Sequence, residues 1–548
     1  MKKFSFLVRK PRGPWPKEGL PAFVLEQDNW NDYGFQTLYR LSYVTLDANG
    51  RIVEDLIGPV KILRAAQSSS DGLLINSAFE RLGEEFCSVG TSLDYYERLR
   101  ALPARLRRVA LDALRDVVAK PALVPRFRQE KGWTESLFRD GKDEGYLSLA
   151  RGLLTDDYSA LPGDDLCFSF KMAGWLEPTE FSFISNTAPS PNLLVDALPG
   201  RVAVLVGKNG SGKSTMLARL ARIAHGTVEQ RGREPLSELG CIAPSGIGFP
   251  RVVTVTFSPF DSFRLPGTDG REHRKILGEL EAGEGRFAFI GLRDIAAKAR
   301  YSSKSKASVG INGILDADRL ATSRLKSIDQ LCSEFLVFLD RVRKKRRKRL
   351  LNTLLASVLD GSAFSPLLDE GVGDADLNDV QRCFLLCSTG HKIAALVISG
   401  LLATLEKSSL VLFDEPETHL HPPLLAALMH ALRKILEKHE SFCVVATHSP
   451  VVVQESLARS VKLIRREGSE SIVRTPSSET FGESIGLITA EVFGLNAEAT
   501  DYHAVLDKLV AVHRNHEEIE ALFLHGQMSH QGRAYVMSRL MQAKEDYS

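Results

Sequence analysis

The chain has 548 residues, of which 44% are hydrophobic and 25% are charged, so we expect a globular protein of several domains. Lysine and arginine total 70 against 68 for aspartate and glutamate, and a net charge of +2 excludes nucleic-acid binding through overall charge alone. Seven cysteines without a CxxC pair argue against a disulfide framework or a zinc ribbon and predict reduced thiols in a cytoplasmic protein. The longest apolar run, 393–405, is shorter than the roughly 20 residues that span a bilayer, so we expect a buried helix there and no membrane contact.

Residues 1–165 are predicted to form an accessory α+β region. Strand patterns occur at 38–46 and 51–56, and apolar residues recur at helical spacing from 93 to 118. No motif for a chemical reaction is present in this region. We interpret it as a structural lobe or as a docking site for a partner.

A regular pattern of strands begins near residue 166. The segments 201–206 (apolar from Val202 onward), 410–413 and 442–446 consist of apolar residues, which is typical of strands buried on both faces of a parallel sheet. Between them lies a mostly helical stretch, with one long amphipathic helix expected from about 323 to 359. The predicted divisions after residue 165 are 166–265, 266–380 (the helical stretch), 381–500, and a charged helical tail at 501–548.

A phosphate-binding loop follows the first apolar strand. Gly207-Lys-Asn-Gly-Ser-Gly-Lys-Ser214 fits the pattern GxxxxGK[ST] and precedes a helical sequence, which is the setting that this loop requires. Its backbone N–H groups and the helix N-terminus can surround phosphates, while Lys213 reaches the β/γ oxygens and Ser214 is a ligand of Mg²⁺. The residues predicted to bind the nucleotide are Gly207, Asn209, Gly210, Ser211, Gly212, Lys213, Ser214 and Thr215.

Polar residues follow the next two apolar strands as well. Asp414 and Glu415 come directly after 410–413, so Asp414 can hold Mg²⁺ and Glu415 can act as the general base for the attacking water. His448 comes after 442–446 and can donate a hydrogen bond to a γ-phosphate oxygen. The predicted catalytic residues are Lys213, Glu415 and His448, and the predicted metal ligands are Ser214 and Asp414.

Together these motifs resemble the ABC-type ATPases. A signature candidate, Leu386-Cys-Ser-Thr-Gly-His-Lys392, matches the family's LSxGx pattern at Ser388 and Gly390. The resemblance implies an α/β fold, ATP and Mg²⁺ as cofactors, and a homodimer in which Ser388 and Gly390 bind the γ-phosphate of the nucleotide held by the other subunit. Cys387 and His391 depart from the commoner residues, and the strand at 251–257 leads into Ser-Pro-Phe-Asp rather than into a clear Q-loop glutamine.

The resemblance also gives the predicted divisions a meaning. Residues 166–265 and 381–500 would be the two parts of one ATPase head, and 266–380 would be a helical insertion. The sequence DEPETHLHP, from Asp414 to Pro422, is similar to the branch that includes repair proteins and phage-defence ATPases. The whole layout resembles the PtuA ATPases of Septu-type and retron-associated anti-phage systems, in which a separate HNH endonuclease is encoded alongside.

The segment Arg341 to Arg349 holds eight basic residues in nine. Two interpretations stay open, a solvated helix face paired with acids and a contact with the phosphate backbone of DNA or RNA. No base-reading motif accompanies the run, so any contact would be independent of sequence. The residues predicted to touch nucleic acid are Arg343, Lys344, Lys345, Arg346 and Arg347.

The functional hypothesis is therefore an ATP-hydrolysing subunit of an anti-phage defence complex. No nuclease pattern is present in the sequence, so head dimerisation would regulate a separate HNH nuclease. In a retron context, a reverse transcriptase and its RNA/DNA product would be further partners. The alternatives are a DNA-repair ATPase of the RecF or SMC kind that acts without an effector nuclease, and the energising subunit of a transporter.

Overall fold

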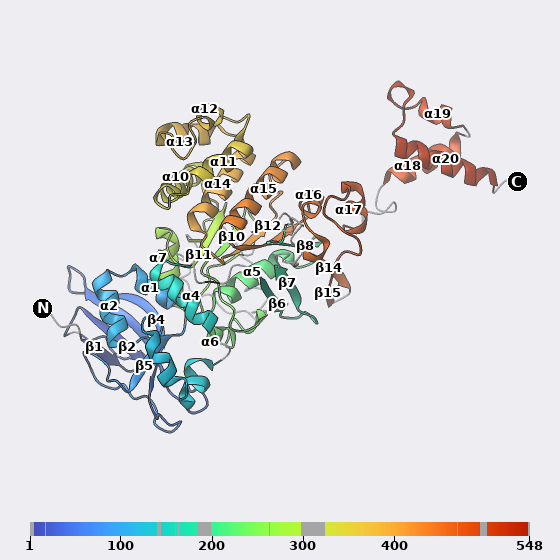
Figure 1. Cartoon of the computed structure of the whole chain (residues 1–548). Coiled ribbons are helices and arrows are strands. Elements are labelled where there is room, and N and C mark those ends of the chain that lie inside the picture. Colours follow the sequence, from blue (N-terminus) through green and yellow to red (C-terminus); the bar gives the residue numbers. More distant parts are fainter. Residues whose placement is uncertain are drawn as a thin grey trace, which may run out of the picture. The chain divides into compact units, whose positions relative to one another are not determined.

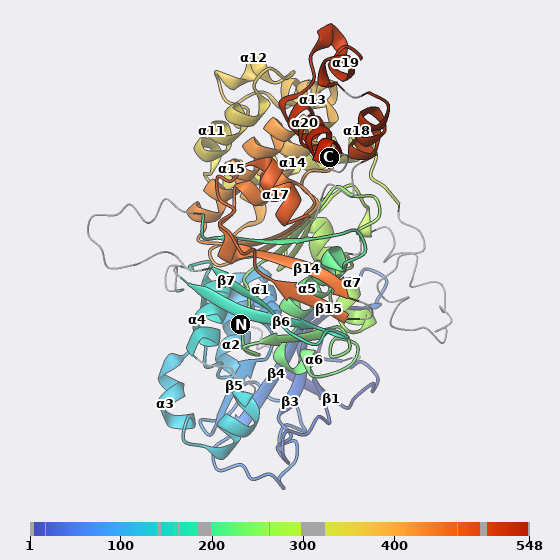
Figure 2. The ribbon, with the colours of Figure 1, turned by 90° about the vertical axis from the view of Figure 1, so that its right-hand side faces the viewer.

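The computed structural model describes residues 5–16, 18–139, 144–158, 161, 165–183, 199–261, 263–296, 324–467, 470–493, 501–513 and 515–545. It forms two compact units, Met1–Phe481 and Gly482–Ser548. Figures 1 and 2 show the chain from two directions. Among the described residues, no helix combines the length and the hydropathy that crossing a membrane requires. All seven cysteines are free thiols.

The N-terminal region of the first unit is built on a five-stranded sheet in the order β1-β2-β3-β4-β5. β1 and β2 are parallel and the other neighbours are antiparallel. The expected helix at 93–118 is two helices instead, because Pro103 lacks an N–H group and starts a second helix. The elements are β1 (Phe6–Arg9), β2 (Ala22–Gln27), β3 (Leu38–Leu46), β4 (Ile52–Arg64), β5 (Phe86–Gly90), α1 (Leu93–Ala101), α2 (Ala104–Ala113), α3 (Val124–Phe127) and α4 (Glu144–Thr155).

The head is built on a seven-stranded sheet in the order β11-β10-β12-β13-β8-β14-β15. Its neighbours are parallel except β15, which runs antiparallel to β14. The apolar segments found in the sequence form its centre, because a parallel sheet covered on both faces buries every side chain. The strands are β8 (Val202–Gly207), β10 (Val252–Thr256), β11 (Phe287–Gly291), β12 (Leu410–Asp414), β13 (Phe442–Thr447), β14 (Val461–Glu467) and β15 (Glu470–Arg474).

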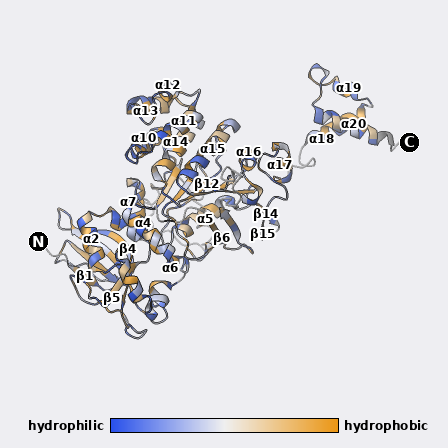
Figure 3. Cartoon of the chain, viewed as in Figure 1, coloured by the Kyte–Doolittle hydropathy of each residue, from blue (hydrophilic) through white to orange (hydrophobic). Residues whose placement is uncertain are grey.

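Each face of the central sheet has its own cover. α5 (Lys213–His225) packs on β8, β10, β12 and β13, together with a small sheet of β7 (Thr179–Phe183), β6 (Leu166–Met172) and β9 (Gly240–Ala243). The buried helix expected at 393–405 is α14 (Thr389–Thr404), which packs on β10 and β11 and against α15 (Pro422–Lys438). Apolar residues concentrate in these central strands and in α14 (Figure 3).

The stretch 266–380 is mostly helical, as expected, but it also contains β11, which is an edge strand of the head sheet. The expectation of one long helix from about 323 to 359 is wrong, because the helix is broken into α10 (Ile328–Lys344) and α11 (Lys348–Leu359). Arg346 has a φ of 57° at the break, a conformation that no helix continues through. Residues 297–323 of this stretch lie outside the described residues. Its other helices are α7 (Gly270–Ala282), α12 (Ser365–Leu368) and α13 (Leu377–Leu386).

A short helix lies between β13 and β14 of the head, and the second unit is helical, as expected for the tail. α16 (Pro450–Gln454) belongs to the first unit. In the second unit, Leu506, Ile519, Met528 and Val536 form a small core of its own. Its helices are α17 (Ile485–Glu491), α18 (Asp501–Val512), α19 (His516–Glu520) and α20 (His530–Glu545).

Candidate active site

The carboxyl ends of four parallel strands meet at one edge of the head sheet. Thr256 on β10 pairs with Asp414 on β12, and Asp414 pairs with Ala446 on β13. Thr447, the last residue of β13, pairs with Val206 on β8. The residues that follow these strands are therefore brought together, as the sequence predicts for ligand sites at the carboxyl edge of an α/β sheet.

The phosphate loop connects β8 to α5 through backbone that only glycine adopts easily. Gly210 has a φ of 79° and Gly212 a φ of 99°, and Gly212 precedes the first residue of α5. A Cβ on Gly207 would lie 2.4 Å from the carbonyl oxygen of Ile464 on β14. The loop thus combines close backbone packing with the N-terminus of a 13-residue helix, an arrangement suited to an anion.

The side chain of Lys213 contacts the phosphate loop to which the residue belongs. Its Nζ donates to the carbonyl oxygens of Gly207 at 2.8 Å and Lys208 at 3.4 Å, and lies 2.8 Å from Nε2 of His448. Since an ammonium group only donates, this Nε2 must be unprotonated and accept. Burial and the neighbouring lysine lower the pKa of His448, which favours that neutral form.

The two predicted metal ligands are in contact. The Ser214 hydroxyl donates to Oδ1 of Asp414 at 3.0 Å. Burial is the main cause that raises the pKa of Asp414 to about 7, and the charges of Glu415 and Asp261 act in the same direction. A buried carboxylate with other carboxylates nearby is stabilised when a cation binds to it. The hydroxyl beside it supplies a second protein oxygen, and Mg²⁺ is commonly bound through one or two protein oxygens of this kind. The residues present fit Mg²⁺.

Glu415 has a positive φ of 48°, which turns the chain sharply after β12. Its N–H donates to the carbonyl oxygen of Ala446 at 2.8 Å, so the turn is fixed to β13. One carboxylate oxygen lies 4.0 Å from Nε2 of His448, and about a third of the side chain is exposed. Glu415 is therefore held beside Lys213 and His448, with an open side toward solvent.

Glu417 is a site residue that we did not single out in the sequence. Its carboxylate accepts from the N–H of His448 at 2.5 Å and from the hydroxyl of Thr447 at 2.8 Å. Burial raises its pKa, and the hydrogen bonds oppose that rise. The signal was present, because Glu417 stands two residues beyond Glu415 in the same loop, but its role depends on contacts with a different strand.

The signature candidate lies at the start of α14. Ser388 is the N-cap, and its hydroxyl lies 2.9 Å from Nδ1 of His391. Gly390 has no room for a side chain, since a Cβ would lie 3.2 Å from the carbonyl oxygen of His419. Among the described residues, no hydrogen bond or ion pair joins Ser388 or Gly390 to the phosphate loop of the same chain. The structure thus does not bring these residues together with the rest of the site within one chain.

At the position expected for the Q-loop, the chain carries Asp261. Its side chain is buried and forms an ion pair with Arg293, which also donates to the Asp261 carbonyl oxygen at 2.9 Å. The second carboxylate oxygen, Oδ2, has no hydrogen-bond partner. Burial is the main cause that raises the pKa of Asp261 to about 6. An acid–arginine pair therefore stands beside Asp414 where the family resemblance leads one to expect glutamine.

Most of the basic run is engaged within the fold. Arg343 donates to the carbonyl oxygens of Gly373 and Ala375, each at 2.7 Å. Arg347 donates to those of Leu402 and Leu405 and pairs with Glu406 at 3.0 Å. Lys345 also pairs with Glu406, and Lys344 pairs with Asp340 at 2.6 Å. Of the five residues predicted to touch nucleic acid, Arg346 alone has no ion pair or side-chain hydrogen bond among the described residues.

Comparisons with known proteins show what the chain as a whole and its second half resemble. A family profile described as "AAA domain, putative AbiEii toxin, Type IV TA system" matches residues 283–454. Protein ea59 of Escherichia phage lambda is 30% identical over 542 residues, covering 95% of each chain.

Two solved structures are similar at a lower level. An SMC head bound to the C-winged helix domain of ScpA has 12% identity and a TM-score of 0.28, covering 57% of this chain and 98% of its own. The SMC head domain from Thermotoga maritima has 14% identity and a TM-score of 0.26, covering 57% of this chain and 100% of its own. TM-scores this low do not support any statement about function. The chain belongs to the family of protein ea59, and residues 283–454 are similar to the AAA-domain family.

Proposed function

We propose that this chain binds and hydrolyses ATP with Mg²⁺ and that two of its heads close around the nucleotides. The observation that carries the proposal is the meeting of Lys213, Ser214, Asp414, Glu415 and His448 at one sheet edge. Phosphoryl transfer to water requires mainly positioning and charge stabilisation, and this edge supplies both.

Four of these residues have a defined task in this proposal. Lys213 leaves its carbonyl partners and His448 to contact β/γ-phosphate oxygens. Asp414 and Ser214 hold Mg²⁺, which neutralises charge that develops on the phosphates. Glu415 takes a proton from the attacking water, and its fixed backbone turn keeps the carboxylate in place.

The proposed dimer follows from residues that have no partner site in their own chain. The N-terminus of α14, with Ser388 and Gly390, is exposed to an incoming group at Ser388 and packed against the loop after β12 at Gly390. In the proposal this helix end contacts the γ-phosphate held by the other head. Binding at one phosphate loop would then depend on both chains, and hydrolysis would separate them.

As a finer part of the proposal, the closed dimer regulates a separate HNH nuclease in an anti-phage complex. The exposed apolar side chains of the second unit support its role as the docking site for this nuclease. Four of them are each more than half exposed: Val512, Leu522, Leu524 and Met541. In the alternative, a repair ATPase of the RecF or SMC kind, the chain would act on DNA without such an effector.

The decisive variant is Glu415→Gln. It should bind ATP normally, hydrolyse it at least about 100-fold more slowly and accumulate as a dimer with ATP and Mg²⁺, measured by phosphate release and light scattering. Turnover at the normal rate would overturn the assignment of the base, and a monomer with bound ATP would overturn head closure.

The effector is tested separately with purified proteins. The chain alone should not cut DNA, and an HNH nuclease encoded beside it should co-purify with it and lose that binding on Leu524→Ser. Metal-dependent cleavage by the chain alone would overturn the effector hypothesis. ATP-dependent DNA binding without any nuclease partner would favour the repair alternative.

A further inference from the structure

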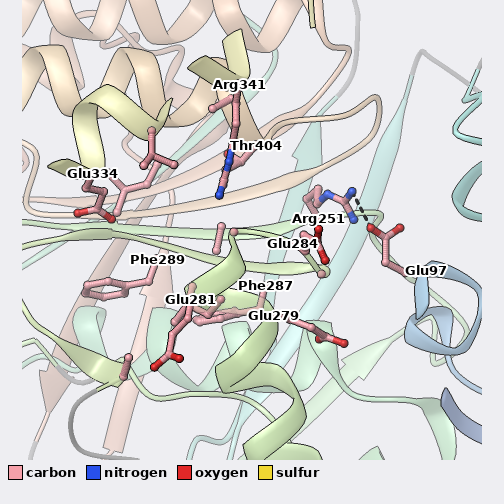
Figure 4. Close-up of a pocket in the computed structure, with 18 of the residues that line it drawn as sticks. Glu97, Arg251, Glu279, Glu281, Glu284, Phe287, Phe289, Glu334, Arg341 and Thr404 are labelled. Carbon is pink, nitrogen blue, oxygen red and sulfur yellow. Dashed lines mark ion pairs between the residues drawn. The ribbon is translucent and has the colours of Figure 1, made fainter. Parts of the chain in front are cut away.

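A cavity of about 720 Å³ opens in the first unit, apart from the predicted catalytic residues. It lies between α1 of the N-terminal region, the edge strand β11 and helix α10 (Figure 4). Neither Lys213, Asp414, Glu415 nor His448 lines it. Its volume is that of a site for a small molecule.

One part of the cavity wall is apolar. Leu102 comes from the N-terminal region, Leu280 and Phe289 from α7 and β11, and Val337 and Phe338 from α10. Val337 is 47% exposed and lies on the face of α10 that lines the cavity. An apolar group that entered the cavity would cover this surface.

The charged part of the wall is almost fully paired. Eight basic residues line the cavity, and seven of them have carboxylate partners. These pairs are Arg98–Glu279, Arg100–Glu97, Arg251–Glu97, Lys275–Asp55, Arg293–Asp261, Lys326–Glu334 and Lys345–Glu406. The exception within the described part of the chain is Arg341.

Arg341 is held at the cavity with spare donors. Its Nη2 donates to the carbonyl oxygen of Ala282, the last residue of α7, at 2.7 Å. A guanidinium has five N–H donors, so this bond leaves an edge available for a carboxylate, sulfonate or phosphate. The approach depends on Gly283, because a Cβ there would lie 1.7 Å from an Arg341 nitrogen.

We propose that this cavity binds an amphiphilic anion with one acidic group, which pairs with Arg341 while its apolar body covers Val337, Phe338 and Leu280. Glu281, Glu284 and Glu334 also line the cavity, so a polyanion such as a nucleic acid would meet repulsion. A single acidic group on an apolar body pairs with Arg341 and meets less of this repulsion than a polyanion does.

The cavity is connected to the catalytic edge by one residue. Arg293 lines the cavity and is buried, and its guanidinium holds the carboxylate and carbonyl oxygen of Asp261 and the carbonyl oxygen of Phe263. This loop follows β10, the strand that pairs with β12 and Asp414. A bound ligand that moves Arg293 would alter the loop beside the metal site and change the rate of ATP hydrolysis. This consequence rests on the proposed ATPase function.

The binding test uses the full chain and the probe 8-anilinonaphthalene-1-sulfonate, which has one sulfonate on an apolar aromatic body. Fluorescence titration should show saturable binding to the unaltered protein. Arg341→Gln and Gly283→Ala should each weaken it at least tenfold, while Arg349→Gln, an exposed arginine outside the cavity, should leave it within twofold. Thermal melting checks that each variant is folded.

Competition with octanoate and with 1-naphthyl phosphate then identifies the acidic group. Displacement by octanoate indicates a carboxylate ligand, and displacement by 1-naphthyl phosphate indicates a phosphate ligand. Equal probe binding by Arg341→Gln, no saturable binding by the unaltered protein, or displacement by neither compound would overturn the proposal.

The coupling is measured independently as ATP hydrolysis with the better competitor at saturation. The rate should change at least twofold in the unaltered protein and stay constant in Arg341→Gln. A ligand that binds through Arg341 without changing the rate would overturn the coupling through Arg293. If the chain hydrolyses no ATP, the proposed function fails, and the fluorescence experiment still decides whether the cavity binds the anion.

Discussion

The catalytic edge of the head sheet and the basic run at 341–349 are both dense in charge, but the fold uses them in opposite ways. At the catalytic edge, Lys213 contacts two carbonyl oxygens and a histidine and has no carboxylate partner within ion-pair distance among the described residues. In the basic run, Arg343 and Arg347 cover carbonyl oxygens at the ends of chain segments, and Lys345 is paired.

The difference shows that charge density in a sequence does not separate a ligand site from a structural one. The charged residues that follow parallel strands lie side by side at the carboxyl edge of the sheet, where their side chains face a space that a ligand can enter. Charged groups at helix ends find unsatisfied carbonyl oxygens within the fold. This difference can be tested with variants: those at the catalytic edge should abolish ATP hydrolysis, and those in the basic run should lower the stability of the fold.

The largest effect is expected for Lys213→Ala. Loss of the Lys213 ammonium group should lower ATP hydrolysis about 1000-fold, because a pre-positioned charge is lost where negative charge develops. The free energy of unfolding should fall by no more than about 1–3 kcal/mol, because Lys213 loses two hydrogen bonds to carbonyl oxygens and no ion pair. The matched control is Lys208→Ala in the same loop, whose side chain is exposed, and which should stay within threefold by phosphate release. Comparable losses in both variants would remove the special role of Lys213.

The opposite result is expected for the double variant Arg343→Gln and Arg347→Gln. These side chains hold four carbonyl oxygens, and their loss should lower the free energy of unfolding by about 2–6 kcal/mol, because an intramolecular hydrogen bond contributes about 0.5–1.5 kcal/mol net. Lys344→Gln with Arg346→Gln is the control of equal charge. It should leave stability within about 0.5 kcal/mol, since both side chains are exposed. Denaturant unfolding measures both.

The same two double variants distinguish the two interpretations of the basic run, a structural role and contact with nucleic acid. If nucleic acid binds there, the control pair Lys344 and Arg346 should weaken binding and flatten its salt dependence without loss of stability. Unchanged binding in a folded control variant would leave the run with its structural role alone.

Much of the head could be predicted because its signals are local. The apolar segments before the phosphate loop, before Asp414 and before His448 each became a central strand, since uninterrupted apolar residues have few other places in a fold. The loop glycines follow from the backbone conformation that the motif needs. These features depend on neighbours in sequence, and they were found.

What could not be predicted depends on contacts between distant segments. β11 was missed because Phe287–Gly291 is short and follows a helix, and its strand state comes from pairing with β10. The break at Arg346 was missed because the apolar stripe continues across it, while the turn is fixed by Arg347 reaching Leu402 and Leu405. Tertiary contacts decided both cases.

A third group of charged residues lies where α1 meets the head, and its effect on stability can be measured as a function of pH. His225 is buried beside Asp94 and Arg286. Burial is the main cause that lowers the pKa of His225 to about 4, from an ordinary 6.5. Between pH 6.5 and 4 the unfolded chain binds a proton that the folded chain does not, so stability is complete above pH 6.5 and falls as the pH drops through this window.

At pH 5 the expected loss is about 2 kcal/mol relative to pH 7. His225→Phe should make the melting temperature less dependent on pH within this window, whereas His530→Gln, an exposed histidine on α20, should not. An equally steep pH dependence in His225→Phe would assign the effect to other groups. A confirmed effect would place this charge with the structural ones, like Arg343 and Arg347.

The smallest expected effect is that of Glu417→Ala, which tests whether the catalytic edge needs a residue that performs no chemistry. Without the carboxylate, the N–H of His448 and the hydroxyl of Thr447 lose their acceptor, and the histidine is no longer fixed beside Glu415. We expect kcat to fall about tenfold with little change in KM, a cost of about 1.4 kcal/mol in the transition state. Glu417→Gln should restore most of the rate, because its amide oxygen can accept from His448 and its amide nitrogen can donate to Thr447. A rate that stays low in Glu417→Gln would mean that the charge of Glu417, rather than its hydrogen bonds, acts on the reaction. A rate unchanged in Glu417→Ala would mean that Lys213 and Glu415 alone position His448, and that the catalytic edge is fixed by the sheet without this support.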